Sequence, residues 1–567
     1  MPKTVPMKKE TRPETRFIFV TGGVMSSLGK GLTGASLAAL LQARGHSVVL
    51  QKLDPYLNID PGTMSPFQHG EVFVTDDGME TDLDLGHYER FTNVPCTRNS
   101  NITSGQIYWN ILNRERRGDY LGATVQVVPH VTNEMKEFIR RNDGVADFAL
   151  VEIGGTVGDI ESPAFFEAIR QFAHEVGRKR CCFMHLTYAP YLACVGETKT
   201  KPSQHAVRAL LELGIQADVV VVRSERGVER ADLDKIALFS NIPASHVINC
   251  PDSDTIYRVP VTLHANGLDK AVLDVFGMEA PVPELKKWQR MADIKVNPPH
   301  HTRIAVVGKY IQLGDSYKSL NEALVHGGFA HDSGLQIDFV DSETLETMTD
   351  AEVAERLQGA DGILVPGGFG ARGTEGKIRA ITYARTARVP YFGICLGMQM
   401  AVVEFARNKV GLSGAGSTEF TKELGAPAHP IIGMMTEWDK AGSTEKRSDT
   451  SNLGGTMRLG AYPCTLGSHT LARRLYGAES ITERHRHRYE FNSSYKQQLE
   501  KAGMVFSGMS PDGKLAEIVE LADHPWFVAV QFHPEFKSRP MVPHPLFAGF
   551  VQASLAHQQQ GRERAAA

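Results

Sequence analysis

Short continuous apolar runs recur along the first half of the chain, and longer stretches with helical periodicity separate them. The clearest runs lie at residues 17–20, 47–50, 148–153 and 218–222. Unbroken apolar runs of this length indicate strands buried on both faces, and their alternation with helical stretches indicates a parallel sheet. We therefore expect a doubly wound α/β domain from residue 17 to about residue 276.

A second series of apolar runs follows a proline-rich segment. Residues 277–301 carry four prolines around an amphipathic stretch at residues 285–291, which is typical of a linker. New strands are then expected at residues 304–307, 362–365, 391–394 and 527–531. The pattern predicts the following division: a flexible extension at 1–16, a first α/β domain at 17–276, a linker at 277–301, a second α/β domain at 302–556 and a disordered polar tail at 557–567.

Composition and charge narrow the class of protein. Of the 567 residues, 42% are hydrophobic and 22% are charged, which is ordinary for a globular protein and excludes a fibrous or disordered chain. The formal net charge of −4 supplies no overall attraction to nucleic acid or to an anionic membrane. The seven cysteines are an odd number without metal-ligand spacing, and no apolar run is long enough to span a bilayer. We expect a cytoplasmic protein without a nucleic-acid or membrane partner.

The most informative segment of the second domain is Gly393–Gln399, in which a buried strand passes through a glycine-flanked turn into a helix. A cysteine in such a turn, here Cys395, lies near backbone N–H groups and a helix N-terminus, which favour a thiolate. Downstream, His533 can take the thiol proton and Glu535 can orient the imidazole. An isolated buried cysteine is more often a small core residue, but this combination favours a Cys-His-Glu triad.

These motifs resemble those of class I glutamine amidotransferases, and Pro366–Gly370 matches their oxyanion loop. The resemblance implies that the backbone N–H groups of Gly368 and Leu396 bind the tetrahedral oxyanion. It also implies a set of residues that bind glutamine, among which an arginine suits the substrate carboxylate. That set is Gly368, Leu396, Gly397, Met398, Gln399, Glu419 and Arg488.

The alternating segment Arg484–Arg488 allows another interpretation. In a strand, His485 and His487 would share one face and the three arginines the other, which could indicate a metal or nucleic-acid site. Two histidines without a nearby cysteine are an incomplete zinc shell, so the metal site is the less favoured interpretation.

The first domain begins with a strand, a glycine-rich loop at Thr21–Gly31 and a helix-forming run to Leu41. This order predicts a phosphate-binding loop in which backbone amides surround the phosphates and Lys30 neutralises charge. The spacing departs from the Walker pattern because five residues separate Gly23 from Gly29 and because Gly31 replaces the usual hydroxyl residue. The Mg²⁺ ligands must therefore come from elsewhere, and we expect Asp84 and Glu152, since a glutamate within an apolar strand is costly to bury without a cation.

With both sites in view, the chain resembles the CTP synthase family from about residue 17 to residue 556. Five further segments carry the resemblance: Lys52–Tyr56, Asp60–Pro66, Arg117–Gln126, Gly196–His205 and Glu483–Glu490. It implies a P-loop-like, dethiobiotin-synthetase-like synthetase domain followed by a class I glutaminase domain. It also implies a ligase that phosphorylates UTP at O4 with ATP and Mg²⁺ and then replaces the phosphate with ammonia from glutamine, carried through an internal tunnel.

The same resemblance implies binding residues in the synthetase domain. Those expected at the ATP and UTP phosphates are Ser26, Ser27, Leu28, Gly29, Lys30, Gly31, Leu32 and Lys52. Those expected at UTP or product CTP are Ser26, Asp159, Ile160, Glu161, Lys199, Thr200, Lys201, Pro202, Ser203, Gln204 and Lys235. Lys235 could equally lie on an exposed helix face with charge pairs. The family further implies activation by GTP, inhibition by CTP and a homotetramer. Leu121 and the surface loop at residues 372–377 are expected to take part in the GTP response, although a surface loop with arginine and lysine is more often simply solvated.

Three other functions fit part of the pattern. An ATP-dependent enzyme that amidates a carboxylate would share both sites, but the segments between them disfavour it. An ATPase switch of the partitioning type normally has a lysine where this chain has Thr21. A structural or filament-forming protein with inactive sites is disfavoured because the residues expected at both centres are present: Cys395, His533, Glu535, Lys30 and Asp84.

Overall fold

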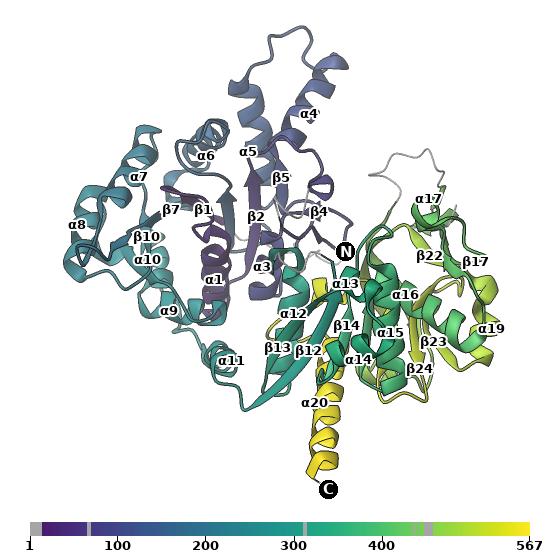
Figure 1. The fold of residues 1–567 in the computed structure, drawn as a ribbon. Coiled ribbons are helices and arrows are strands. Elements are labelled where there is room, and N and C mark those ends of the chain that lie inside the picture. The colour runs from purple at the N-terminus through teal and green to yellow at the C-terminus, as the bar shows by residue number, and fades with distance from the viewer. Residues whose placement is uncertain are drawn as a thin grey trace, which may run out of the picture. The chain divides into compact units, whose positions relative to one another are not determined.

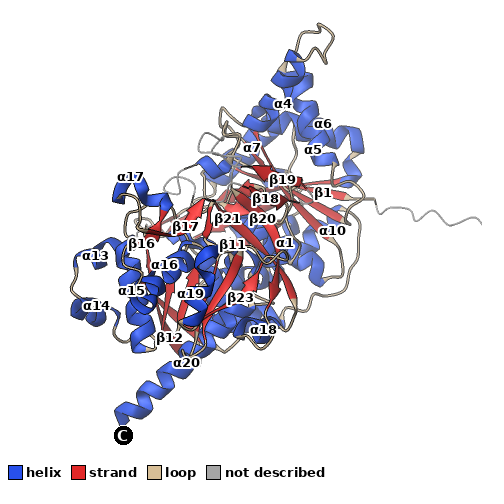
Figure 2. Cartoon of the chain, turned by 90° about the vertical axis from the view of Figure 1, so that its right-hand side faces the viewer, coloured by secondary structure: helices blue, strands red, loops and turns tan. Residues whose placement is uncertain are grey.

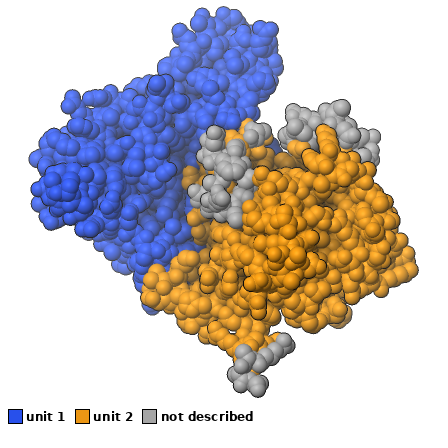
Figure 3. Space-filling model, viewed as in Figure 1, with its two compact units in different colours: residues 1–59, 87–292 blue, residues 60–86, 293–567 orange. Residues whose placement is uncertain are grey.

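The computed structural model describes residues 14–64, 70–309, 314–434, 437–440, 443–446 and 457–566. It divides into two compact units, residues 1–59 with 87–292 and residues 60–86 with 293–567 (Figure 3). The division differs from the expected one in two ways. The boundary at Ala292 lies inside helix α11 (Lys286–Val296), and residues 60–86 group with the second unit although they are flanked in sequence by the first.

The first unit contains a sheet of seven strands in the order β11-β10-β7-β1-β6-β2-β5, and every neighbouring pair is parallel. In that order the strands are Val247–Pro251, Val219–Ser224, Cys181–Tyr188, Arg16–Gly22, Phe148–Ile153, Val48–Asp54 and Asn101–Thr103. A short pair, β8 (Tyr191–Leu192) with β9 (Glu197–Thr198), lies outside this sheet. The apolar runs of the sequence thus form the centre of a parallel sheet, as expected.

Helices cover both faces of this sheet (Figure 1). Phe17 and Phe19 of β1 belong to one buried cluster, which also takes side chains from α4 to α8. Ile18 and Val20 alternate with them, are equally buried and face the side on which α1 packs. The helices are α1 Lys30–Ala43, α3 Asp84–Thr92, α4 Ser104–Arg116, α5 Thr132–Arg140, α6 Pro163–Val176, α7 Lys201–Glu212, α8 Arg230–Ser240, α9 Val259–Ala265 and α10 Leu268–Val275.

The second unit contains a nine-stranded sheet in the order β13-β12-β14-β15-β25-β24-β23-β20-β21. The first five strands are parallel and the others antiparallel. In sheet order they are Ser333–Asp341, His300–Gly308, Gly362–Val365, Tyr391–Ile394, Phe527–Val530, Ala516–Leu521, Met504–Met509, Arg458–Leu466 and Ser480–His487. Smaller sheets join β16 Ala415–Ser417, β17 His429–Met434 and β22 Tyr489–Phe491, then β18 Glu437–Lys440 with β19 Ser443–Lys446, and β3 Phe73–Val74 with β4 Glu80–Thr81.

The nine-stranded sheet also has two covered faces (Figure 2). Ala305 and Val307 of β12 join the buried cluster that includes α13 to α16, whereas Ile304 and Val306 join the cluster that includes α12 and α20. The helices are α12 Lys318–Phe329, α13 Ser342–Thr347, α14 Asp350–Leu357, α15 Thr374–Ala387, α16 Leu396–Phe405, α17 Thr421–Leu424, α18 Leu471–Tyr476, α19 Lys496–Lys501 and α20 Pro545–Ala566. Two doubly wound α/β units are therefore confirmed.

The structure describes the C-terminal tail but not most of the N-terminal extension, so only the expectation for the tail can be checked. Residues 1–13 of the expected flexible extension lie outside the described residues. The polar tail from residue 557 was expected to be disordered, but α20 continues to Ala566, so this expectation is wrong. The helix persists because alanine, glutamine, glutamate and arginine, which fill this segment, are good helix formers. Among the helices of the described ranges, none combines the length and the apolar composition that crossing a membrane requires.

Candidate active site

Cys395 lies in the turn between β15 and α16 of the second unit, with φ 52° and ψ −104°. A non-glycine residue rarely adopts this conformation, and such strain is typical of a nucleophile held at an elbow. The glycines on either side allow the turn. A Cβ atom at Gly393 would lie 2.9 Å from the Cβ of Ala529, and one at Gly397 would collide with the carbonyl oxygen of Val365.

Replacing Gly397 with alanine should therefore destabilise the elbow. Because the collision involves backbone of the neighbouring strand β14, it cannot be relieved by a rotamer change, and we expect a loss of about 2–4 kcal/mol in the free energy of unfolding. Gly561→Ala is the matched control, since a Cβ atom there meets nothing within 4 Å in helix α20. Denaturant unfolding of the two variants measures the difference. Equal stability of Gly397→Ala and the unmodified protein would contradict the packing described.

His533 and Glu535 follow β25 and lie close together, as expected. The imidazole Nδ1 is 2.7 Å from Oε1 of Glu535, and the backbone N–H of His533 donates to the carbonyl of Arg484 at 2.7 Å. Burial alone would lower the pKa of His533, but the negative charges of Glu535 and Cys395 outweigh it and raise the pKa to about 10. Nε2 has no hydrogen-bond partner of normal geometry within the described part of the chain. It can therefore exchange a proton with the thiol or the substrate.

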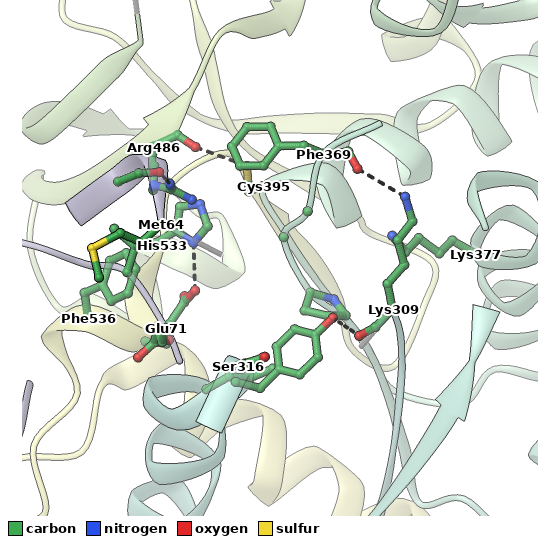
Figure 4. A pocket seen from close by; sticks show the side chains of 18 residues that line it. Met64, Glu71, Lys309, Ser316, Phe369, Lys377, Cys395, Arg486, His533 and Phe536 are labelled. Atoms are coloured by element: carbon green, nitrogen blue, oxygen red, sulfur yellow. Dashed lines mark hydrogen bonds and ion pairs between the residues drawn. The ribbon is translucent and has the colours of Figure 1, made fainter. Parts of the chain in front are cut away.

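Cys395, His533 and Glu535 line one pocket of about 310 Å³ (Figure 4). Gly367 lies beside both the cysteine and the histidine, because a Cβ atom on it would lie 2.8 Å from Cε1 of His533 and 3.5 Å from Cβ of Cys395. Gly368, the expected oxyanion donor, lines the same pocket. The pocket also takes Met64 and Glu71 from the segment 60–86, which the sequence did not connect with this site.

Two side chains, Lys309 and Glu419, hold the backbone of the loop that follows Gly368. Nζ of Lys309 donates to the carbonyl of Phe369 at 3.1 Å and to that of Gly370 at 3.0 Å. The N–H of Gly370 donates to the Glu419 carboxylate at 2.9 Å. Lys309 was not expected at the site, because an isolated lysine after a buried strand is not part of a recognisable sequence motif. The loop is thus fixed by an ammonium on its carbonyls and a carboxylate on its amide.

The expected glutamine-binding residues lie on different elements and differ in burial. Leu396, Gly397, Met398 and Gln399 form the first turn of α16 and are buried. The side-chain amide of Gln399 donates to the carbonyl of Tyr489 at 2.9 Å and to Oε1 of Gln531 at 3.2 Å. Glu419 reaches the oxyanion loop, as described above, whereas Arg488 is half-buried just after β21. Their role in binding glutamine stays a prediction.

The segment Arg484–Arg488 serves packing and ion pairing in the structure. His485 and His487 are buried and lie 2.9 Å apart, Nδ1 to Nε2. Arg484 is buried too and pairs with Asp76 at 2.5 Å, and Arg486 pairs with Glu80 at 2.7 Å. Both carboxylates belong to residues 60–86. Within the described ranges, no group of three or more His, Cys, Asp or Glu residues is arranged to hold a metal ion.

In the first unit, the expected phosphate loop connects β1 to α1. Gly29 precedes the helix with φ 87°, and Ser26 and Ser27 are exposed while Leu28 and Gly31 are buried. Nζ of Lys30 donates to the carbonyl of Gly155 at 2.5 Å. A Cβ atom on Gly23 would lie 2.6 Å from that of Ala206, so the loop runs close to α7. The arrangement exposes the turn and places a lysine and a helix N-terminus behind it, as a phosphate site requires.

Lys52 and Glu152 lie next to the phosphate loop in the sheet. Glu152 of β6 is in register with Val20 of β1 on one side and Lys52 of β2 on the other. Lys52 is buried and Nζ is 3.4 Å from Oδ1 of Asp54. Glu152 is also buried and accepts a hydrogen bond from the hydroxyl of Tyr88. A buried carboxylate at this end of the sheet is a suitable ligand for Mg²⁺, which commonly uses one or two carboxylates besides phosphates and water.

Asp84, the other expected metal ligand, opens α3, and the helix crosses the division between the units. The grouping assigns Asp84 to the second unit and Glu152 to the first, so their pairing at one metal stays a prediction.

The residues expected at UTP or CTP fall into two regions of the first unit. Asp159, Ile160 and Glu161 are exposed after β6, and Oδ2 of Asp159 accepts from the N–H of Thr156 at 2.7 Å. The second region is the stretch from Lys199 into α7. There Lys199 pairs with Glu197 at 2.5 Å, and Lys201 is exposed. Pro202 is half-buried, and Thr200, Ser203 and Gln204 are buried. Lys235 is exposed on α8.

The residues expected to take part in the GTP response differ in solvent exposure. Leu121 is 95% exposed. Residues 372–377 were expected to form a surface loop, but α15 begins at Thr374, and Lys377 is 1% exposed. That expectation is wrong for Lys377, because the helix turns its side chain inward.

Comparison with known protein families gives two matches that together cover most of the chain. The family described as CTP synthase N-terminus matches residues 16–278. The family described as glutamine amidotransferase class-I matches residues 312–553.

Individual relatives match over nearly the full length. A CTP synthase of Paramagnetospirillum magneticum is 57% identical over 541 residues, which cover 95% of this chain and 99% of that protein. A CTP synthase of Zymomonas mobilis is 58% identical over 541 residues, which cover 95% of this chain and 98% of that protein. Among solved structures, the glutaminase domain of Trypanosoma brucei CTPS with bound acivicin has 41% sequence identity and a TM-score of 0.40, covering 45% of this chain and 94% of that one.

Proposed function

The chain belongs to the CTP synthase family, and from this premise we propose how its residues divide the reaction. As a glutamine-dependent ligase it forms CTP from UTP, with ATP and glutamine as the other substrates. The second unit releases ammonia at Cys395, and the first activates UTP at the phosphate loop around Lys30. The observation that carries the proposal is the strained elbow that places Cys395 in one pocket with the paired His533 and Glu535.

Glutamine hydrolysis follows from the groups in this pocket. His533 carries the proton of the Cys395 thiol, so the sulfur attacks as a thiolate and forms a bond to the amide carbon while the carbonyl electron pair moves to oxygen. The N–H groups of Gly368 and Leu396 stabilise this oxyanion. The electron pair then returns, the C–N bond breaks, and His533 gives its proton to the nitrogen, which leaves as NH₃. A water molecule, deprotonated by His533, hydrolyses the thioester to glutamate and restores the thiol.

In the first unit the chain's part is to hold phosphates and balance their charge. The amides of Ser26 to Gly31 and the N-terminus of α1 bind the phosphates, and Lys30 and Lys52 stabilise the charge that moves when the γ-phosphoryl group passes to the uracil oxygen. Asp84 and Glu152 would hold Mg²⁺, which would supply positive charge against the phosphate oxygens. Phosphate is a far better leaving group than the original carbonyl oxygen, so NH₃ can then displace it at C4.

Regulation and assembly belong to the same proposal: activation by GTP, inhibition by CTP, a homotetramer, and a cytoplasmic location. Large apolar side chains that the first unit leaves exposed support self-association. They include Trp109 at 54%, Leu112 at 57%, Leu121 at 95%, Leu238 at 78% and Phe239 at 59% exposure. The seven cysteines are free thiols, which agrees with a reducing compartment.

The test is an assay for CTP. Purified protein is incubated with ATP, Mg²⁺, UTP and glutamine, and each component is omitted in turn. We expect CTP and glutamate in equal amounts, and no CTP when ATP, UTP or Mg²⁺ is missing. Glutamate formation without CTP under the complete conditions would overturn the proposal and favour the alternative, an enzyme that amidates a carboxylate.

A further inference from the structure

Lys377 is a buried cation in the wall of the glutaminase pocket. It lies on the first turns of α15, its side chain is 1% exposed, and it lines the same pocket as Cys395 and His533. Lysines are rarely buried so completely, because removing an ammonium group from water is costly unless an anion or hydrogen-bond acceptor compensates. Its position therefore calls for a negative charge inside the pocket.

The groups around Lys377 do not supply a direct partner. Lys309, which follows β12, donates to the carbonyls of Phe369 and Gly370, and Glu419 accepts from the N–H of Gly370. For Nζ of Lys377, the described part of the chain shows neither a hydrogen bond nor an ion pair. It lies 3.8 Å from the position of a Cβ atom on Gly368, directly behind the expected oxyanion loop. Figure 4 shows Lys309 and Lys377 on the side of the pocket where Phe369 lies.

The reaction creates the missing anion. Three other cationic side chains line the pocket. His533 is paired with Glu535, Lys309 donates to loop carbonyls, and Arg486 is paired with Glu80. His533 faces Cys395 as well as Glu535, but among these pocket cations Lys377 alone has no carboxylate or carbonyl partner within the described residues, so its charge remains for the sulfur anion and the oxyanion that follows it. A fixed cation in a site shielded from water stabilises such charge strongly, and it needs no reorganisation when the charge appears.

We propose that Lys377 is an electrostatic positioning residue of glutamine hydrolysis: its ammonium group, behind the Gly368 loop, stabilises the negative charge that forms on sulfur and on the carbonyl oxygen. The inference rests on the glutaminase function proposed above. It gives this residue a task in the chemistry, beyond its place in the expected GTP-responsive segment.

The proposal has a consequence for pH dependence. Burial lowers the pKa of Lys377 to about 7, and Lys309 acts in the same direction, whereas Glu419, Cys395 and Glu346 act against them. A lysine loses its charge as the pH rises through its pKa, so the turnover number for glutamine hydrolysis should fall as the pH rises above about 7. His533, with a pKa raised to about 10, keeps its proton over this range and does not produce the fall.

The test compares Lys377→Met, which has similar length without charge, with Lys377→Arg, which keeps a charge at all relevant pH values. Glutamate release is measured from pH 6 to pH 9, and ammonium-driven CTP formation serves as the control for folding. For Lys377→Met we expect kcat to fall roughly 10²-fold with KM within about threefold, together with loss of the fall in activity above neutral pH. Lys377→Arg should restore part of kcat and extend activity to higher pH.

Two results would overturn the inference. One is a Lys377→Met enzyme whose kcat and pH profile match those of the unmodified protein. The other is an equal loss of glutamine-driven and ammonium-driven CTP formation, which would make Lys377 a general structural residue. If the unmodified protein releases no glutamate at all, the proposed function fails first, and this result is distinct from both.

Discussion

Replacing Cys395 with alanine is expected to abolish CTP formation from glutamine and to leave CTP formation from ammonium intact. Cys395 supplies the sulfur that forms the thioester, and no other cysteine lines the pocket within the described ranges. Loss of a covalent nucleophile lowers kcat by roughly 10⁴-fold or more. The phosphate loop around Lys30 belongs to the other unit and does not depend on this thiol. Initial rates of CTP formation with each nitrogen source measure the effect.

The matched control is Cys194→Ala, which removes an exposed thiol from the first unit. It should leave both rates within about twofold of those of the unmodified protein. Retention of glutamine-driven synthesis in Cys395→Ala would identify a different nucleophile. Loss of the ammonium-driven reaction as well would show that the two centres are not chemically separate.

The reciprocal change is Lys30→Met, for which we expect the loss of CTP formation from both nitrogen sources. Lys30 begins α1 behind the exposed turn, and its ammonium is the charge that meets the phosphates. Removing such a group from a phosphoryl-transfer site lowers the rate by roughly 10³-fold. Glutamate release measured without nucleotides should stay within about threefold of the unmodified protein, because Cys395, His533 and Glu535 are untouched.

Lys270→Met is the control for Lys30→Met, since it removes an exposed lysine from α10 without touching the loop. We expect its rates to match those of the unmodified protein. A Lys30→Met variant that still makes CTP from ammonium at a normal rate would show that the glycine-rich loop is not the phosphate site.

Much of the fold could be predicted because its central strands are continuous apolar runs. The run at 17–20 lies within β1, Arg16–Gly22, and that at 527–531 overlaps β25, Phe527–Val530. The elbow at Cys395 could be predicted equally well from the sequence. Glycines on both sides of a cysteine indicate a tight turn in which close contacts leave no room for a side chain. Local patterns thus sufficed wherever the determining contacts lie within one short segment.

Other features depend on partners far away in sequence and could not be predicted. Residues 60–86 group with the second unit because Asp76 and Glu80 pair with Arg484 and Arg486, about four hundred residues later. The alternation of arginine and histidine at residues 484–488 is visible in the sequence, but it does not identify the carboxylates with which the arginines pair. Lys377 was placed on the surface because a lysine is usually solvated, and only the packing of α15 shows that it is buried.

The central claim, which follows from the tunnel that the family resemblance implies, is that nitrogen released at Cys395 reaches UTP without mixing with ammonia in solution. The most direct test supplies glutamine labelled with ¹⁵N in its amide together with an equal concentration of unlabelled ammonium at neutral pH, and measures the ¹⁵N content of the amino group of CTP by mass spectrometry. The account predicts that nearly all CTP carries the label, because the transferred NH₃ stays shielded from protonation and exchange. CTP that carries the label only in the proportion found in the ammonium of the solution would contradict it.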